Sequence, residues 1–181
     1  GFQALGYLLY ESAEAETSNL MIEEPRQDYL VAIVQQMQEN THAALTEWQE
    51  IVSTGIFSSV AAQGTDAGSS VAMLVNAINQ NLERNLRDGK LAIPLGVRSL
   101  GIPIPEAGEA YFAGYSKELL LAAMQVYRNL YEGVTNAGIN GAGLYEYLEA
   151  IKAEDTAGEN LADLIRAQIL EIEAGIESLE G

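Results

Sequence analysis

The residues of this chain that could do chemistry are mainly carboxylates and tyrosines, with one histidine and no cysteine. His42 lies inside a long helical pattern, and no second histidine or cysteine completes a zinc-binding set. A Ser-His-Asp triad would have to use His42 as its base, and no Gly-x-Ser-x-Gly motif indicates a nucleophilic serine. The glycine-rich stretches near Gly64 and Gly138 lack the lysine of a phosphate-binding loop. We therefore interpret His42 as a structural or surface histidine and expect no nucleotide site.

Two groups of carboxylates could collect a hard cation such as calcium through oxygen ligands. One group lies in the first loop and the other on the last predicted helix: Glu11, Glu14 and Glu16, and Glu171, Glu173 and Glu177. The alternative is that these residues form solvated acidic faces that keep the protein soluble. We favour the alternative, because acidic residues occur along the whole chain.

A tyrosine-rich stretch is the third chemical feature. Tyrosine combines an apolar ring with a polar hydroxyl, so such residues could line a ligand groove. Packing at the edge of the core is the alternative that we favour. The residues concerned are Tyr111, Tyr115, Tyr127 and Tyr131.

Composition limits the classes of partner. Nine basic and 26 acidic residues give a formal net charge of −17, which repels nucleic acid and anionic membranes and attracts cations or basic partners. No run of 18 apolar residues is present, so we predict no membrane-spanning helix. The absence of cysteine excludes disulfides and leaves the compartment open. The chain begins with Gly1 inside an apolar segment, so we expect that an upstream part has been removed.

Helices are the elements that must position these residues. Apolar residues recur three and four positions apart in several segments, the spacing that lines one face of a helix. Pro25 suits the first turn of the second segment, and Ser69 or Ser70 suits the N-cap of the third. The predicted helices cover residues 2–9, 26–54, 71–86, 116–132, 144–151 and 159–179.

The boundaries between these helices are indicated by glycine, proline and serine. The Asp88-Gly89 pair is expected to end the third helix, and Ser116 stands where an N-cap of the next would be. The proline- and glycine-rich connector 91–109 cannot form a regular helix and could hold a short strand. A short helical turn is expected at 56–62.

Long amphipathic helices must bury their apolar stripes against one another. We therefore predict an all-α fold, an up-and-down helical bundle, in one domain that covers residues 1–181 and lacks upstream helices.

The opening segment carries a family resemblance. Residues 1–10, GFQALGYLLY, resemble the helix of imelysin-like proteins that carries the motif Gly-x-His-x-x-Glu followed by an apolar run. In that motif, His and Glu lie on one helical face and could jointly hold a metal. Here Gln3 stands in place of the histidine and Gly6 in place of the glutamate.

Later segments resemble the same family in order and spacing, so the chain is similar to the larger, C-terminal part of an imelysin-like protein. These segments are the long helix that contains Trp48, the helix 69–86, the stretch EAYFAGYS at 109–116, the stretch RNLYEG at 128–133, and the loop before Leu144.

The resemblance implies an all-helical architecture of two bundles, an exported location in the periplasm or on the cell surface, and a link to bacterial iron uptake. It also implies a peptidase label, against which the replacement of both motif residues argues. The leading hypothesis is a non-catalytic binding or accessory protein of the cell envelope, with a ligand site at Gln3, Arg128 and Tyr131 and with no catalytic residues, metal or cofactor.

Two alternatives remain open. One is a metallopeptidase of the imelysin type that uses carboxylates outside the motif. The other is a helical interaction scaffold that pairs with upstream helices or with a partner chain.

Overall fold

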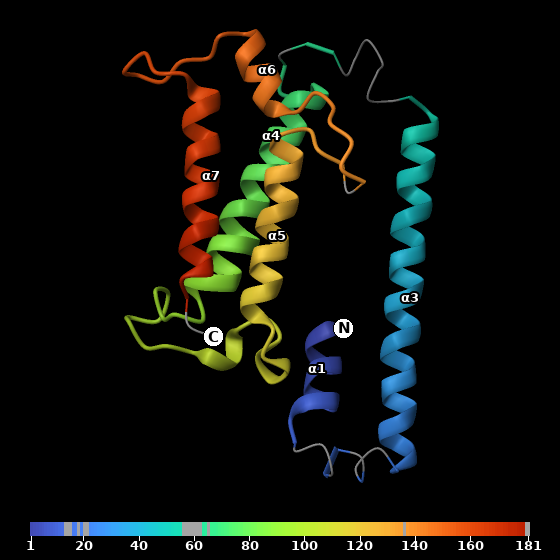
Figure 1. The fold of residues 1–181 in the computed structure, drawn as a ribbon. Helices are drawn as coiled ribbons and strands as arrows, with labels where there is room; N and C mark the ends of the chain where they lie inside the picture. The colour runs from blue at the N-terminus through green and yellow to red at the C-terminus, as the bar shows by residue number, and fades with distance from the viewer. Residues whose placement is uncertain are drawn as a thin grey trace. The chain divides into compact units, whose positions relative to one another are not determined.

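The chain is built from α-helices in the computed structural model, which describes residues 1–12, 16–17, 19, 22–55, 63–64, 66–135 and 137–179 (Figure 1). The helical turn expected at 56–62 and the side chain of Glu14 lie outside the described residues. The chain divides into two compact units, Gly1–Gly114 and Tyr115–Gly181. The single domain expected over 1–181 stays a prediction.

The first unit begins with a helical pair. Helix α1 (Phe2–Tyr10) packs on α3 (Glu24–Ser53), and the two helices run in opposite directions (Figure 1). Pro25 lies in the first turn of α3, where its missing N–H group costs no hydrogen bond. Gly55 follows the end of this helix with a φ of 62°, the left-handed conformation that glycine adopts readily. All 30 residues of α3 are described, and none of them is buried.

A second helical segment of this unit starts at a serine cap and continues as a π-helix. Ser69 is buried, and its hydroxyl accepts a hydrogen bond of 3.3 Å from the N–H of Ala72 at the start of α4 (Ser70–Gln80). The chain then continues directly into a π-helix, η3 (Asn81–Ala92). The serine cap predicted from the sequence is thereby confirmed.

The predicted helix end at Asp88-Gly89 is wrong. Both residues lie inside η3, and the N–H of Ile93 donates a 3.0 Å hydrogen bond to the carbonyl of Asp88, five residues earlier. Glycine ends a helix where it turns left-handed, and Gly89 does not adopt that conformation.

The connector after η3 folds as turns and two single 3₁₀ turns, η4 (Pro105–Ala107) and η5 (Tyr111–Ala113). Residues 93–115 are all described, and the short strand that this stretch could have held is not formed. Lys90 and Glu109 form an ion pair that ties the connector to η3. Because η5 packs on α1, the connector returns to the first helix of the chain.

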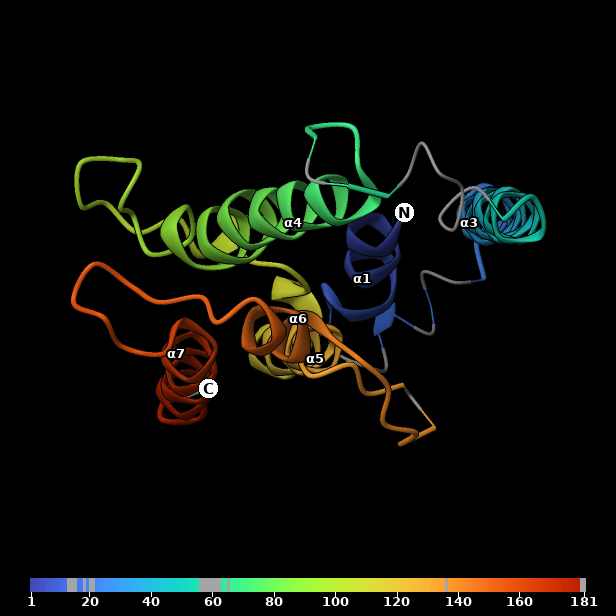
Figure 2. The same cartoon turned by 90° about the horizontal axis from the view of Figure 1, so that it is seen from above.

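The second unit is a small helical bundle. Helices α5 (Ser116–Tyr131) and α7 (Leu161–Glu177) run antiparallel and lie side by side in both views (Figures 1 and 2). The short helix α6 (Leu144–Ala150) packs on both of them. The shared core consists of buried residues from α5 and α7: Leu120, Met124, Tyr131, Ala162, Ile169 and Ile176.

The ends of α5 and α7 are held by different groups. Ser116 is the first helical residue of α5 and not its N-cap, because Tyr115 occupies the cap position without a side-chain bond. That part of the sequence-based prediction is wrong, since the acid at Glu118 is one residue short of the capping-box spacing. Asn160 caps α7 by accepting a 3.1 Å bond from the N–H of Asp163. Lys117 Nζ donates to the carbonyl of Glu177 at the other end of α7, at 2.9 Å.

The all-α fold class predicted from the sequence is confirmed. Five of the six predicted helices begin and end within two residues of their expected bounds. Among the described residues, no helix combines the length and the apolar character that crossing a membrane would require.

Candidate functional site

A small cavity lies where the first helix meets the connector. Its volume is about 100 Å³, and Gln3 and Gly6 of α1 form one side of it. The other side comes from residues that lie 100 or more positions later in the chain: Glu106, Gly108, Ala110, Tyr111 and Phe112. The two positions that carry the family resemblance therefore face a cavity within the first unit.

Aromatic rings build the connector side of this cavity. The ring of Phe112 meets the ring of Tyr7 edge-on, with centroids 5.2 Å apart, and it meets Tyr111 at the same distance. Ala110 and Gly114 flank η5 in the left-handed conformation, with φ of 54° and 69°, and these bends turn the connector. The rings and bends hold Tyr111 in the wall of the cavity.

Lys90 of η3 forms an ion pair with Glu109 of this connector. Burial lowers the pKa of the Lys90 ammonium from its ordinary value, because the charged form is less well solvated there. This ion pair joins η3 to the residues that directly precede η5.

The far end of α1 is anchored to α3 by a polar cluster. Arg26 Nη2 donates to the carbonyl of Leu8 at 3.2 Å and lies 3.6 Å from Glu11 Oε1. The hydroxyl of Tyr7 interacts with Glu11, and this hydrogen bond together with the charge of Glu11 raises the pKa of Tyr7. The cluster fixes the orientation of the helix that carries Gln3 and Gly6.

The residues that line this cavity offer groups that could bind a ligand. The amide of Gln3 can both donate and accept hydrogen bonds, and Glu106 contributes a carboxylate. A Cβ added at Gly6 would meet nothing within 4 Å, so this position leaves open space. The ring face of Tyr111 is suited to an apolar or cationic group.

The other two residues of the predicted ligand site lie in the second unit. Arg128 Nη1 binds Glu173 Oε2 on α7 at 2.7 Å, and its Nη2 donates to Gln125 Oε1, also at 2.7 Å. Tyr131 is 4% exposed, and its hydroxyl donates to the carbonyl of Ala162 at 2.8 Å. Burial, the largest cause, raises the pKa of Tyr131 to about 12.

Arg128 and Tyr131 thus join α5 to α7. The ligand site predicted at Gln3, Arg128 and Tyr131 draws on both units of the chain, and it stays a prediction.

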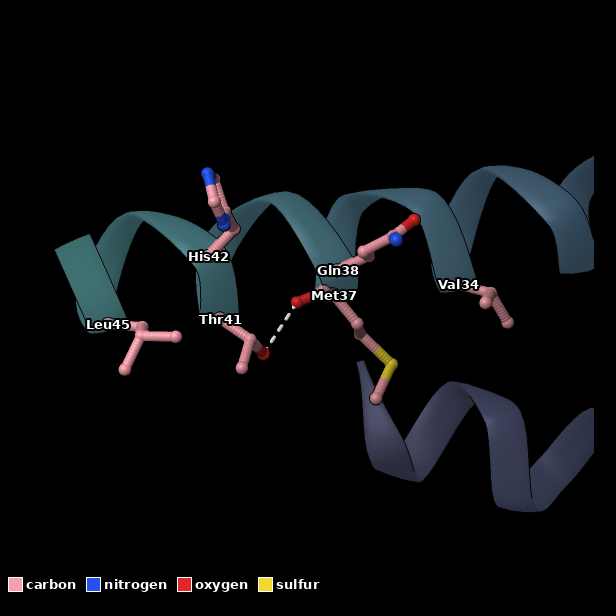
Figure 3. A pocket seen from close by; sticks show the side chains of 6 residues that line it. All are labelled: Val34, Met37, Gln38, Thr41, His42 and Leu45. Carbon is pink, nitrogen blue, oxygen red and sulfur yellow. Dashed lines mark hydrogen bonds between the residues drawn. The ribbon is translucent and has the colours of Figure 1, made fainter.

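The single histidine lies on an exposed face of α3. Figure 3 shows a shallow hollow along this helix, where the ring of His42 leaves the helix on a different side from Thr41 and Leu45. Thr41 donates a 2.8 Å hydrogen bond to the carbonyl of Met37, one turn earlier. A Cβ added at Gly1, at the start of α1, would lie 3.4 Å from Met37 Cγ. His42 is exposed, and its interpretation as a structural or surface histidine stays a prediction.

The predicted carboxylate groups contain ion-paired members. Glu11 pairs with Arg26 and Glu173 with Arg128. In the part of the chain that the structure describes, no three histidine, cysteine, aspartate or glutamate side chains are placed to hold one metal ion.

Sequence reasoning found part of the cavity. Gln3 and Gly6 were singled out by the resemblance, and Tyr111 by the tyrosine-rich stretch. Glu106 and Phe112 were missed, because only the return of the connector to α1 brings them there. The stretch at 109–116, which carries part of the resemblance, was the available signal for Phe112.

The fold is that of an all-α protein, and a small cavity lies against its first helix. A family model described as Imelysin, and labelled as a peptidase family, matches residues 1–181. The chain belongs to the imelysin family. No curated protein and no solved structure matches the chain.

Proposed function

We propose that this chain is a non-catalytic binding or accessory protein of the bacterial cell envelope, related to iron uptake. The observation that carries the proposal is the cavity lined by Gln3 and Gly6 of α1, the two positions that the resemblance matches to the histidine and glutamate of the family motif. An amide is not basic near neutral pH, and glycine has no side chain. These two positions therefore offer hydrogen bonding and space in place of acid–base chemistry.

The location and the link to iron uptake are supported by family membership. The net charge of −17 is compatible with them, because such a field attracts cations and basic partners.

Absence of catalysis is tested by incubating the purified chain with casein, with and without a metal chelator. We expect no cleavage in either condition. Cleavage that the chelator abolishes would overturn the proposal in favour of the metallopeptidase alternative.

Restoring the motif tests whether this cavity corresponds to the motif site of the family. The double variant Gln3→His/Gly6→Glu should bind Zn²⁺ at least about tenfold more tightly than the natural chain in calorimetry. The matched control is Gln36→His, which places a histidine three residues before Glu39 on exposed α3 without a cavity. If the double variant binds no better than this control, the cavity does not correspond to the motif site.

The predicted ligand site is tested with ferric citrate as the probe. Gln3→Ala and Arg128→Ala should each weaken binding, because each removes hydrogen-bond donors. Arg98→Ala, which breaks the exposed ion pair with Asp88, is the control for loss of an arginine. Unchanged affinity in both test variants would remove Gln3 and Arg128 from the site.

A helical interaction scaffold is the second candidate, and the exposed apolar face of α3 favours it. Val34, Leu45 and Val52 are 48%, 54% and 64% exposed, although their spacing places them along one face of the helix. Self-association in sedimentation that Leu45→Ser/Val52→Ser abolishes would support this candidate. Association that the double variant leaves unchanged would count against it.

A further inference from the structure

A second cavity lies in the C-terminal unit, between the loop after α5, the start of α6 and α7. Its volume is about 250 Å³. Val134 lines it together with six residues that are polar or glycine: Glu132, Asn140, Gly141, Tyr145, Glu146 and Arg166. None of the residues used for the proposed function lines this cavity, so a ligand site here is independent of that function.

The guanidinium of Arg166 is held in a fixed orientation on one side of the cavity. Its Nε donates to Glu132 Oε1 at 2.9 Å, and its central carbon lies 5.5 Å from the ring centroid of Tyr145. Among the described residues, these two contacts leave the terminal nitrogens of Arg166 available. Two parallel N–H groups of this kind match the two oxygens of a carboxylate.

The ring beneath Arg166 is itself fixed. The hydroxyl of Tyr145 donates to Asp163 Oδ1 at 2.8 Å, and its ring meets Tyr131 edge-on, with centroids 6.1 Å apart. Because Tyr131 is anchored in the core, the platform for the guanidinium is part of the folded unit and needs no ligand to form.

A carboxylate is held on the other side of the cavity. Glu146 Oε2 accepts a 2.7 Å hydrogen bond from the N–H of Gly143. This bond is the largest cause that lowers the pKa of Glu146, and Arg166 lowers it further. Glu146 is therefore ionised at neutral pH, and its carboxylate places a negative charge on this side of the cavity.

The loop between these groups is pinned by two glycines. A Cβ on Gly143 would lie 2.3 Å from the nitrogen of Gly133, so only glycine permits this close approach. The N–H of Gly141 donates to the carbonyl of Gly133 at 2.8 Å, and the N–H of Thr135 to that of Ile139 at 3.0 Å. The cavity is thus preformed.

We propose that this cavity binds a small zwitterion of the α-amino acid type, with its carboxylate on Arg166 and its ammonium on Glu146. A bare carboxylate would meet an Arg166 that is already paired with Glu132, and it would face the negative charge of Glu146. A bare amine would leave the terminal donors of Arg166 unused. A zwitterion satisfies both sides, and a cavity of this size admits a small molecule of that kind.

The test uses the full chain and three matched probes: L-alanine, which carries both charges, propionate, which lacks the ammonium, and ethylamine, which lacks the carboxylate. Binding is followed by the backbone amide shifts of Asn140, Gly141 and Tyr145 in NMR titrations. We expect L-alanine to bind and each single-charge probe to bind at least about tenfold more weakly. L-alanine that binds no better than propionate or ethylamine would overturn the proposal.

Two variants test the contribution of each charged side chain to binding. Arg166→Gln and Glu146→Gln should each weaken L-alanine binding by about tenfold or more, since each removes one charge-assisted contact. Arg98→Gln, in the other unit, should bind as the natural chain does. Arg166→Lys keeps the positive charge but lacks the planar guanidinium. Its affinity for L-alanine should lie between that of Arg166→Gln and that of the natural chain. Natural affinity in Arg166→Gln would overturn the proposal.

Discussion

The hydroxyl of Tyr131 carries a polar atom into the contact between α5 and α7. Its hydrogen bond to the carbonyl of Ala162 is buried. Tyr131→Phe removes this bond, and we expect the free energy of unfolding to fall by about 1 kcal/mol in urea denaturation. Tyr10→Phe, at a half-exposed position on α1, is the control and should change it by less than about 0.5 kcal/mol. Equal effects would show that the bond contributes nothing.

The same hydroxyl makes stability depend on alkaline pH. Burial raises the pKa of Tyr131 to about 12, so the folded protein favours the neutral hydroxyl. This contribution is complete below pH 10, the ordinary tyrosine value, and is lost as pH rises from 10 to 12. The free energy of unfolding should therefore fall more steeply across this range in the natural chain than in Tyr131→Phe. Identical slopes would contradict the assignment.

The loop after α5 depends on its glycines for two different reasons. Gly143 leaves room for Gly133, whereas Gly138 has a φ of 73° and open space around it. Gly143→Ala should lower the free energy of unfolding by about 3 kcal/mol or more through overlap with backbone atoms. Gly138→Ala should cost about 1 kcal/mol through φ alone. The two losses are compared by urea denaturation. A larger loss in Gly138→Ala than in Gly143→Ala would contradict the close approach of Gly143 to Gly133.

Most of the helices were predictable because each carries its own signal. The stripe from Leu30 to Val52 and the proline at its start define α3 without reference to any other element. The continuation of α4 through Gly89 was not predictable in this way. Glycine has no side chain to indicate whether it ends a helix, and here the π-helical bonding of η3 keeps it inside.

The sites were less predictable, because each depends on contacts between distant segments. Gln3 and Phe112 meet only because η5 returns to α1. Arg166 and Tyr145 belong to different helices, and nothing in their spacing indicates that a guanidinium lies over a ring. The buried bond of Tyr131 to Ala162 agrees with the core-edge packing favoured for the tyrosine-rich stretch, and its place in a ligand site stays a prediction.

At the scale of the whole molecule, the net charge of −17 opposes compaction. Salt should weaken this long-range repulsion more than it weakens the ion pairs of the described residues, because their charged atoms lie only 2.5–2.9 Å apart. We expect the melting temperature to rise by a few degrees between about 10 mM and 150 mM NaCl. The double variant Glu47→Gln/Glu50→Gln removes two negative charges from α3. Its melting temperature should rise less with added salt than that of the natural chain. A fall with added salt would show that local ion pairs dominate.

The lack of buried residues in α3 has a kinetic consequence for its backbone. A helix without burial is maintained mainly by its own hydrogen bonds, so its amides can exchange with deuterium through local opening. The amides around Met124 and Ile169 lie in a packed core and exchange only when much of the second unit opens. Exchange followed by mass spectrometry should label α3 long before α5 and α7. A molecule that covers the face of Leu45 and Val52 should slow that labelling without altering the rest.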